Sequence, residues 1–139
     1  MSDDLASANV NRTYSLGATS IAIFTFTLIF LYPRYLTGEA NPSLFQVTLV
    51  VMAVATFSLV LASFHYYASS LPGRIPEAER ARHSTRGDQL WVLGATMLFL
   101  APSLILFTIG LLGVGLAWLV LWIVYILFVL LNFPRVRQR

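Results

Sequence analysis

The chain lacks cysteine and lysine entirely, so all nine of its basic residues are arginines. The absence of cysteine excludes disulfides, thiolate metal sites, covalent haem attachment and thiol redox chemistry. Charge is also scarce, because 11% of the 139 residues are charged, against about 25% in a typical soluble domain. Since 58% of the residues are hydrophobic, we infer that lipid is the solvent for most of the chain.

Four long apolar runs contain no charged residue, and the charges are confined to the gaps and ends. A helix needs about 20 residues to cross the hydrocarbon layer of a membrane. We therefore predict an all-α integral membrane protein with four transmembrane helices in an antiparallel up-down bundle. The whole chain, residues 1–139, forms one domain in this prediction, and both termini lie on the same side. The predicted helices cover about residues 17–36, 44–68, 89–112 and 115–133.

Two helices are predicted in the stretch from Leu90 to Phe133, which has no charge and is about twice as long as one crossing. Two glycines that flank a single residue disfavour one continuous helix, because glycine costs helix stability. We therefore expect a tight apolar turn around Gly113–Val114–Gly115. Asn41, Pro42 and Ser43 are expected to supply a turn and an N-cap before the second helix, and Asp88 is the expected N-cap of the third.

Polar residues gather in the segment 69–88, which we predict to be a cytoplasmic loop, and in the basic tail 134–139. Pro76 suits the first position of a short helix inside this loop. Glu79 and His83 are four residues apart and could pair within it. Such a helix would have almost no apolar face, so we expect it to stand in water.

The arginines are distributed unequally between the two sides of the predicted bundle. Arg34 is the one basic residue on the far side, beyond the first helix. The excess of arginine on the other side predicts cytoplasmic N- and C-termini, because cytoplasmic segments carry more basic residues. The arginines on the predicted cytoplasmic side are Arg12, Arg74, Arg80, Arg82, Arg86, Arg135, Arg137 and Arg139.

Hydroxyl and small residues recur at seven-residue spacing along the predicted helices, which keeps them on one helix face. These faces could line a neutral path through the membrane, or they could be packing seams between helices. We favour packing, because small-residue seams are general in membrane helices. Candidate path or packing residues are Thr27, Thr48, Thr56, Ser63, Thr96, Pro102 and Ser103.

Pro102 lies near the middle of the third helix, where it removes the backbone donor for the Leu98 carbonyl. A break of this kind can coordinate ions or water in transporters. The alternative is a packing kink that neighbouring hydroxyls satisfy, which we favour because membrane helices tolerate such kinks.

Three further features are weighed as sites. Trp118, Trp122 and Tyr125 form an aromatic stripe that could hold a flat apolar ligand such as a quinone or a lipid tail, although such stripes more often anchor or pack helices. Arg34 could attract anions to a mouth or contact lipid headgroups, and we favour the headgroups. His65 is a speculative haem or metal ligand; one chain offers only this histidine at a suitable depth, although two copies in an oligomer could supply a pair, and we favour an interfacial histidine.

The apolar runs contain no buried ionisable group, which argues against proton relays, ion-coupled transport and voltage sensing. No paired carboxylates, nucleophile elbow, phosphate loop or metal-spaced histidines are present, so the sequence favours a protein that is not an enzyme and predicts no cofactor. Because the arginines flank apolar spans, we expect membrane lipids with anionic headgroups as partners and not nucleic acid.

Two functional hypotheses remain open from the sequence. One is a homo-oligomeric channel- or transport-type protein with a neutral, hydroxyl-lined path, towards which the sequence leans slightly. The other is an accessory or structural subunit of a larger membrane complex. A weaker alternative is a lipid- or quinone-binding membrane protein built on the aromatic stripe.

Overall fold

The computed structural model describes residues 2–71 and 75–136, with side chains placed for residues 8–71 and 75–131. The described chain is all-helical, and all four helices are long and apolar enough to cross a membrane. This confirms the predicted all-helical fold with four helices of spanning length. The helices are α1 (Ser2–Leu36), α2 (Pro42–Ser69), α3 (Glu77–Thr108) and α4 (Leu112–Val136).

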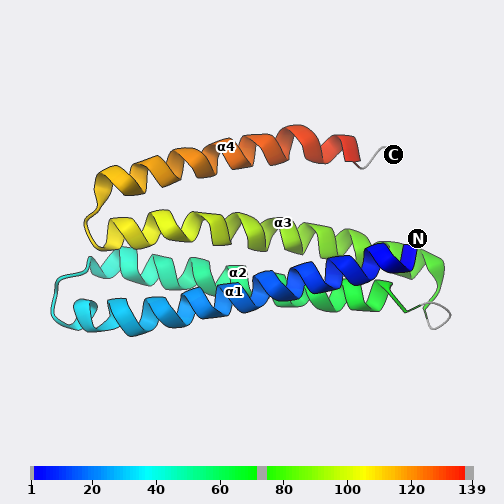
Figure 1. Cartoon of the computed structure of the whole chain (residues 1–139), viewed down its shortest axis with the longest axis horizontal. Coiled ribbons are helices and arrows are strands. Elements are labelled where there is room, and N and C mark those ends of the chain that lie inside the picture. The colour runs from blue at the N-terminus through cyan, green and yellow to red at the C-terminus, as the bar shows by residue number, and fades with distance from the viewer. Residues whose placement is uncertain (1, 72–74, 137–139) are drawn as a thin grey trace.

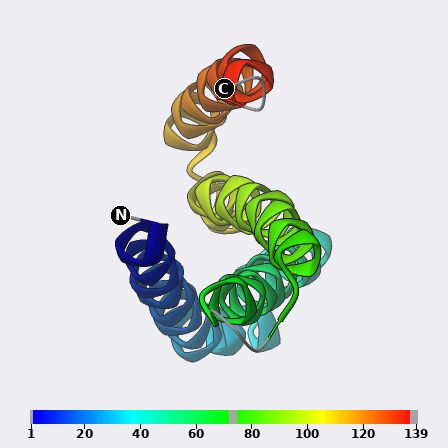
Figure 2. The same cartoon turned by 90° about the vertical axis from the view of Figure 1, so that its right-hand side faces the viewer.

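The helices lie side by side along the long axis of the molecule, and the N and C labels stand towards the same end in Figure 1. Viewed from that end, they form an open arc from α1 through α2 and α3 to α4 (Figure 2). The most extensive contact is between α2 and α3, and α1 packs mainly on α2. Within the described residues, α4 contacts α3 alone. One side of the arc, between α1 and α4, is therefore open.

The core lies between α2 and α3, where small residues let the two helices approach closely. Met52, Ala55 and Leu59 of α2 are fully buried there against Ala101 of α3. Gly94 of α3 shows how close the approach is, because a Cβ built on it would lie 2.7 Å from the Cγ atom of Leu59. The absence of a side chain at this position is thus a condition for the packing of α2 on α3.

The third helix begins at Glu77, twelve residues earlier than the predicted start at about residue 89. The polar segment that we expected as a loop with a separate short helix is a direct extension of the spanning helix. Asp88 is not an N-cap, because it lies inside α3 and its carboxylate accepts a hydrogen bond from Tyr66 instead. The first helix likewise begins at Ser2, well before the predicted start near residue 17. The start of α3 is rich in Glu, Ala and Arg, which are good helix formers, and this suits the extension of that helix beyond its apolar run.

The turn between α3 and α4 lies at residues 109–111, not at the predicted Gly113–Gly115. Gly110 takes a positive φ of 80°, a conformation that favours glycine, and the Leu111 amide donates to the Leu106 carbonyl to close α3. Gly115 lies inside α4 under the ring of Phe107, where a Cβ would come too close to the ring. The glycine that turns the chain and the glycine that packs are thus different residues.

The second helix begins as predicted. Asn41 is its N-cap, and the Asn41 side chain accepts a hydrogen bond of 3.1 Å from the Leu44 amide. Pro33 is accommodated within the last turn of α1, which ends at Leu36.

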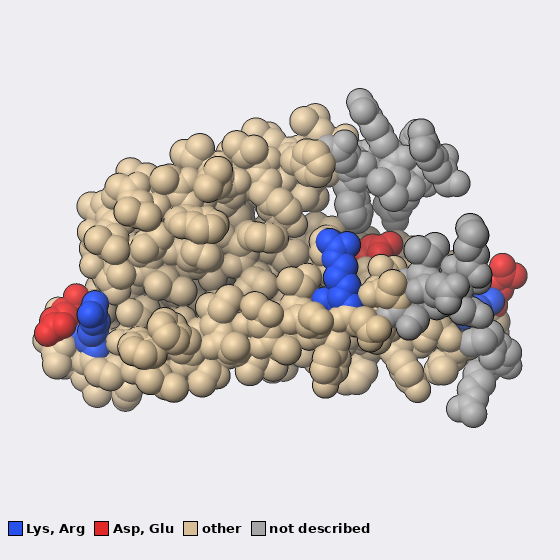
Figure 3. All heavy atoms as spheres, in the orientation of Figure 1, with Lys and Arg blue, Asp and Glu red and all other residues tan. Residues whose placement is uncertain are grey.

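Charged atoms lie towards the two ends of the long axis in Figure 3, with a broad uncharged band between the left end and those towards the right. This pattern suits a multi-pass membrane protein, because the hydrocarbon layer excludes charge. The predicted basic tail 134–139 and part of the connection, residues 72–74, lie outside the placed side chains.

Candidate functional site

The hydroxyl groups between α1 and α2 form a cross-link between these helices. The hydroxyls of Ser20 and Thr56 are 2.8 Å apart, and Thr56 also donates to the Met52 carbonyl at 2.9 Å. Because the single Thr56 proton goes to its own helix, the Ser20 hydroxyl donates to Thr56. Thr27 is buried nearby on α1 and donates to the Ile23 carbonyl. These hydroxyls are therefore used in packing.

A second pair joins α2 to α3. The hydroxyls of Thr48 and Thr108 are 3.3 Å apart, and both residues are buried. Each also lies within hydrogen-bond distance of a carbonyl of its own helix, Leu44 and Leu104. One proton can thus bridge the helices while the other satisfies a carbonyl. Ser63 is only half-buried on α2 and donates to the Val60 carbonyl at 2.7 Å.

Two side chains join α3 to α4 through backbone carbonyls. The buried Ser103 hydroxyl donates to the Gly115 carbonyl at 2.8 Å, and the Trp122 indole N–H donates to the Thr96 carbonyl at 2.9 Å. α3 runs through Pro102 without interruption, one residue before the Ser103 cross-link. A buried indole N–H needs a hydrogen-bond partner, and that of Trp122 finds one across the interface between α3 and α4.

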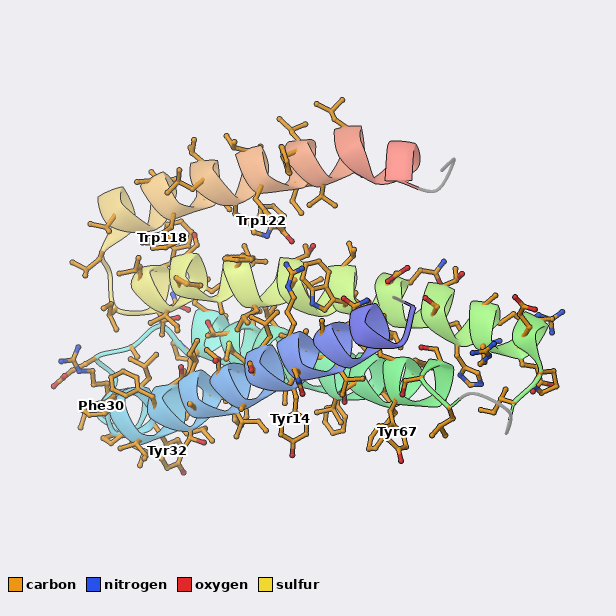
Figure 4. The ribbon with its side chains drawn as sticks, turned by 45° about the vertical axis from the view of Figure 1, so that its right-hand side comes forward. Tyr14, Phe30, Tyr32, Tyr67, Trp118 and Trp122 are labelled. Atoms are coloured by element: carbon orange, nitrogen blue, oxygen red, sulfur yellow. The ribbon has the colours of Figure 1, made fainter. Side chains whose placement is uncertain are left out.

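Of the seven candidate path residues, Thr56, Thr48 and Ser103 make side-chain hydrogen bonds across three different interfaces, α1–α2, α2–α3 and α3–α4. Trp118 and Trp122 lie on the side of α4 that faces α3 in Figure 4, whereas Tyr14, Tyr32 and Tyr67 project outward from the bundle. Tyr125 packs its ring on Phe99 of α3, with centroids 4.9 Å apart.

A polar cluster that the sequence did not reveal lies where α1, α2 and α3 come together near the N-terminal end. His65 of α2 and His83 of α3 place their Nδ1 atoms 2.9 Å apart, so one ring donates and the other accepts. His83 thus pairs with His65 and not with Glu79. Beside them the buried Tyr66 donates its hydroxyl to Asp88 at 2.7 Å.

Gly87 makes room for this cluster, because a Cβ at that position would lie 2.9 Å from the Tyr66 ring. A glycine directly before Asp88 was the one available signal for a close helix approach. The histidine pair offers two converging nitrogens, and no group of three or more metal-binding side chains exists among the described residues. Two ligands would leave half of a tetrahedral metal site unfilled.

Arg12 connects α1 to α3 at the same end of the molecule. Its guanidinium lies over the Trp91 ring, with the Cζ atom 4.6 Å from the ring centroid. Arg12 is therefore a charged group that links α1 to α3. Sequence reasoning used Arg12 only for orientation.

Arg34, the other arginine of α1, is exposed in the last turn of that helix. Its backbone carbonyl accepts hydrogen bonds from the Glu39 and Ala40 amides at the turn into α2.

Comparison of the chain with protein-family models, curated proteins and solved structures finds no match. The contacts of the chain itself are therefore the basis for a functional proposal.

Proposed function

We propose that the four helices cross the membrane as an antiparallel up-down bundle with both termini in the cytoplasm. Arg12 and Arg34 support this proposal, because about 33 Å of helix separates them at 1.5 Å per residue, close to the hydrocarbon thickness of about 30 Å. The excess of arginine at the end that holds Arg12 suits the cytoplasmic side. A reporter that fluoresces only in the cytoplasm, fused to the C-terminus, tests the orientation, and a dark fusion would contradict it.

We further propose that the protein is a non-enzymatic, structural or accessory subunit of a membrane assembly. The observation that carries the proposal is the placement of the hydroxyl groups, which cross-link neighbouring helices and satisfy backbone carbonyls. The polar chemistry of the membrane interior is thus used to hold the bundle together. What remains for partners is α4, which within the described residues contacts α3 alone, and the arginine-bearing start of α3.

A homo-oligomeric channel or transport protein is the competing hypothesis. The open α1–α4 side and the exposed surface of α4 favour association between copies. Because the hydroxyls of one chain are divided between three interfaces, a conducting path in such an assembly would run between copies.

Native mass spectrometry after mild solubilisation separates the two hypotheses. A structural subunit co-purifies with other membrane polypeptides in fixed stoichiometry, and liposomes that contain the purified chain stay tight under ion and solute gradients. A clean homo-oligomer without other polypeptides, combined with flux in the liposomes, would contradict the accessory role and support the channel.

A further inference from the structure

The open side of the arc presents a face that combines aromatic rings with one cation. We call it the α1–α4 face and define it by Arg12, Trp91, Trp122 and Tyr125. The first two residues come from α1 and α3, and the last two come from α4. Helices α1 and α4 make no contact with each other in the described chain, so no protein element covers this face.

The guanidinium of Arg12 is uncompensated on this face. It is exposed and stacks on Trp91, but it makes no hydrogen bond or ion pair with any side chain that the structure places. The Asp88 carboxylate on α3 accepts the Tyr66 hydroxyl. The planar fork of N–H donors is thus available, and this geometry matches the oxygens of a phosphate.

In the topology proposed above, on which this inference rests, Arg12 lies at the depth of a lipid headgroup. About 33 Å of helix separates Arg12 from Arg34, close to the hydrocarbon thickness of about 30 Å. Further along α1, the partly buried side chains of Leu16 and Ile23 pack against the core of α2 and α3. On α4, the Trp122 indole is held by its bond to the Thr96 carbonyl, which leaves its apolar ring for contact with hydrocarbon.

We propose that the α1–α4 face binds one anionic phospholipid of the cytoplasmic leaflet. The phosphate lies on the guanidinium of Arg12 above Trp91, and the acyl chains run along α3 between α1 and α4, beside Trp122. Charge favours this occupant, because the net negative charge of an anionic headgroup is attracted to the Arg12 guanidinium, whereas a zwitterionic lipid offers a phosphate without net negative charge. The proposal is independent of whether the protein is a subunit or a channel.

Tryptophan quenching tests this proposal, because two of the three tryptophans of the chain belong to the α1–α4 face. The full chain is reconstituted in phosphatidylcholine vesicles, and phosphatidylglycerol with brominated acyl chains is added in increasing mole fraction. We expect quenching to reach half-saturation at a mole fraction about fivefold lower than with brominated phosphatidylcholine, the effect of about 1 kcal/mol per arginine. Arg12→Gln should remove this difference, whereas the matched control Arg34→Gln should leave it unchanged.

Additional measurements distinguish a lipid site from a site for a free anion and define the results that would overturn the proposal. Millimolar inorganic phosphate should not relieve the quenching, and relief would show a site for a free anion in place of a lipid. Arg12→Lys keeps the positive charge and should keep part of the preference for phosphatidylglycerol over phosphatidylcholine. If Arg12→Gln does not fold, the Arg12→Lys variant still tests the proposal. Equal curves for the two lipids, equal effects of the Arg12→Gln and Arg34→Gln substitutions, or a dimer that excludes lipid from the face would overturn the proposal.

Discussion

Substitution of Gly94 by alanine tests whether close packing of α2 on α3 holds the bundle together. A Cβ at this position would lie 2.7 Å from the Leu59 Cγ atom and 3.1 Å from the Ala55 carbonyl oxygen. The backbone oxygen cannot rotate away, so the two helices must separate by several tenths of an ångström. Overpacking of this kind costs about 1–3 kcal/mol, and the better helix propensity of alanine returns up to about 1 kcal/mol. We expect a net loss of about 1–2 kcal/mol, which is a factor of about 5–30 in the unfolding equilibrium.

The unfolding free energy of the Gly94→Ala variant is measured by titrating the protein from a mild detergent into sodium dodecyl sulfate, followed by circular dichroism. Gly113→Ala is the matched control, because nothing lies within 4 Å of a Cβ at that helical glycine. A Leu59→Ala background removes the contact with the Leu59 Cγ atom but keeps the contact with the Ala55 carbonyl oxygen, so the cost of Gly94→Ala should shrink without vanishing. A Gly94→Ala variant as stable as the Gly113→Ala control would refute the reasoning.

Three further substitutions test the contacts that the structure adds. Tyr66→Phe removes the hydrogen bond to Asp88 and should cost about 1 kcal/mol in the same titration, whereas the exposed Tyr67→Phe should cost nothing measurable. Asn41→Ala removes the N-cap of α2 and should also cost about 1 kcal/mol, with a matching loss of ellipticity. Ser103→Ala breaks the link from α3 to α4 and should cost about 0.6 kcal/mol, together with faster proteolysis of the connecting turn; unchanged cleavage would count against this link.

Features set by neighbouring residues could be read from the sequence. Long runs without charge define the spans, since a charge in the hydrocarbon layer is too costly. The cap at Asn41 depends on a residue three positions away, so Pro42 and Ser43 beside it were sufficient to predict where α2 begins. The preference for packing over a path also followed from the small-residue seams, and the hydrogen bonds of Ser20 and Ser103 agree with packing.

Features set by contacts between helices could not be read in this way. The pairing of His65 with His83 depends on how α2 and α3 are rotated about their axes, and no local pattern specifies that rotation. The turn was misplaced for the same reason. Gly110 and Gly115 are equally poor helix formers, and it is the ring of Phe107 across the interface that commits Gly115 to α4.

The order of contacts along the arc has a consequence for how the protein is made. Within the described residues, almost all contacts between helices join helices that follow one another in the chain, and the few others join α1 to α3. Contacts between elements close in sequence form quickly, because little chain entropy is lost in closing them. The contacts among α1, α2 and α3 all lie within the first 108 residues. The three-helix unit can therefore be complete during synthesis before α4 enters the membrane, and α4 then has one surface on which to dock.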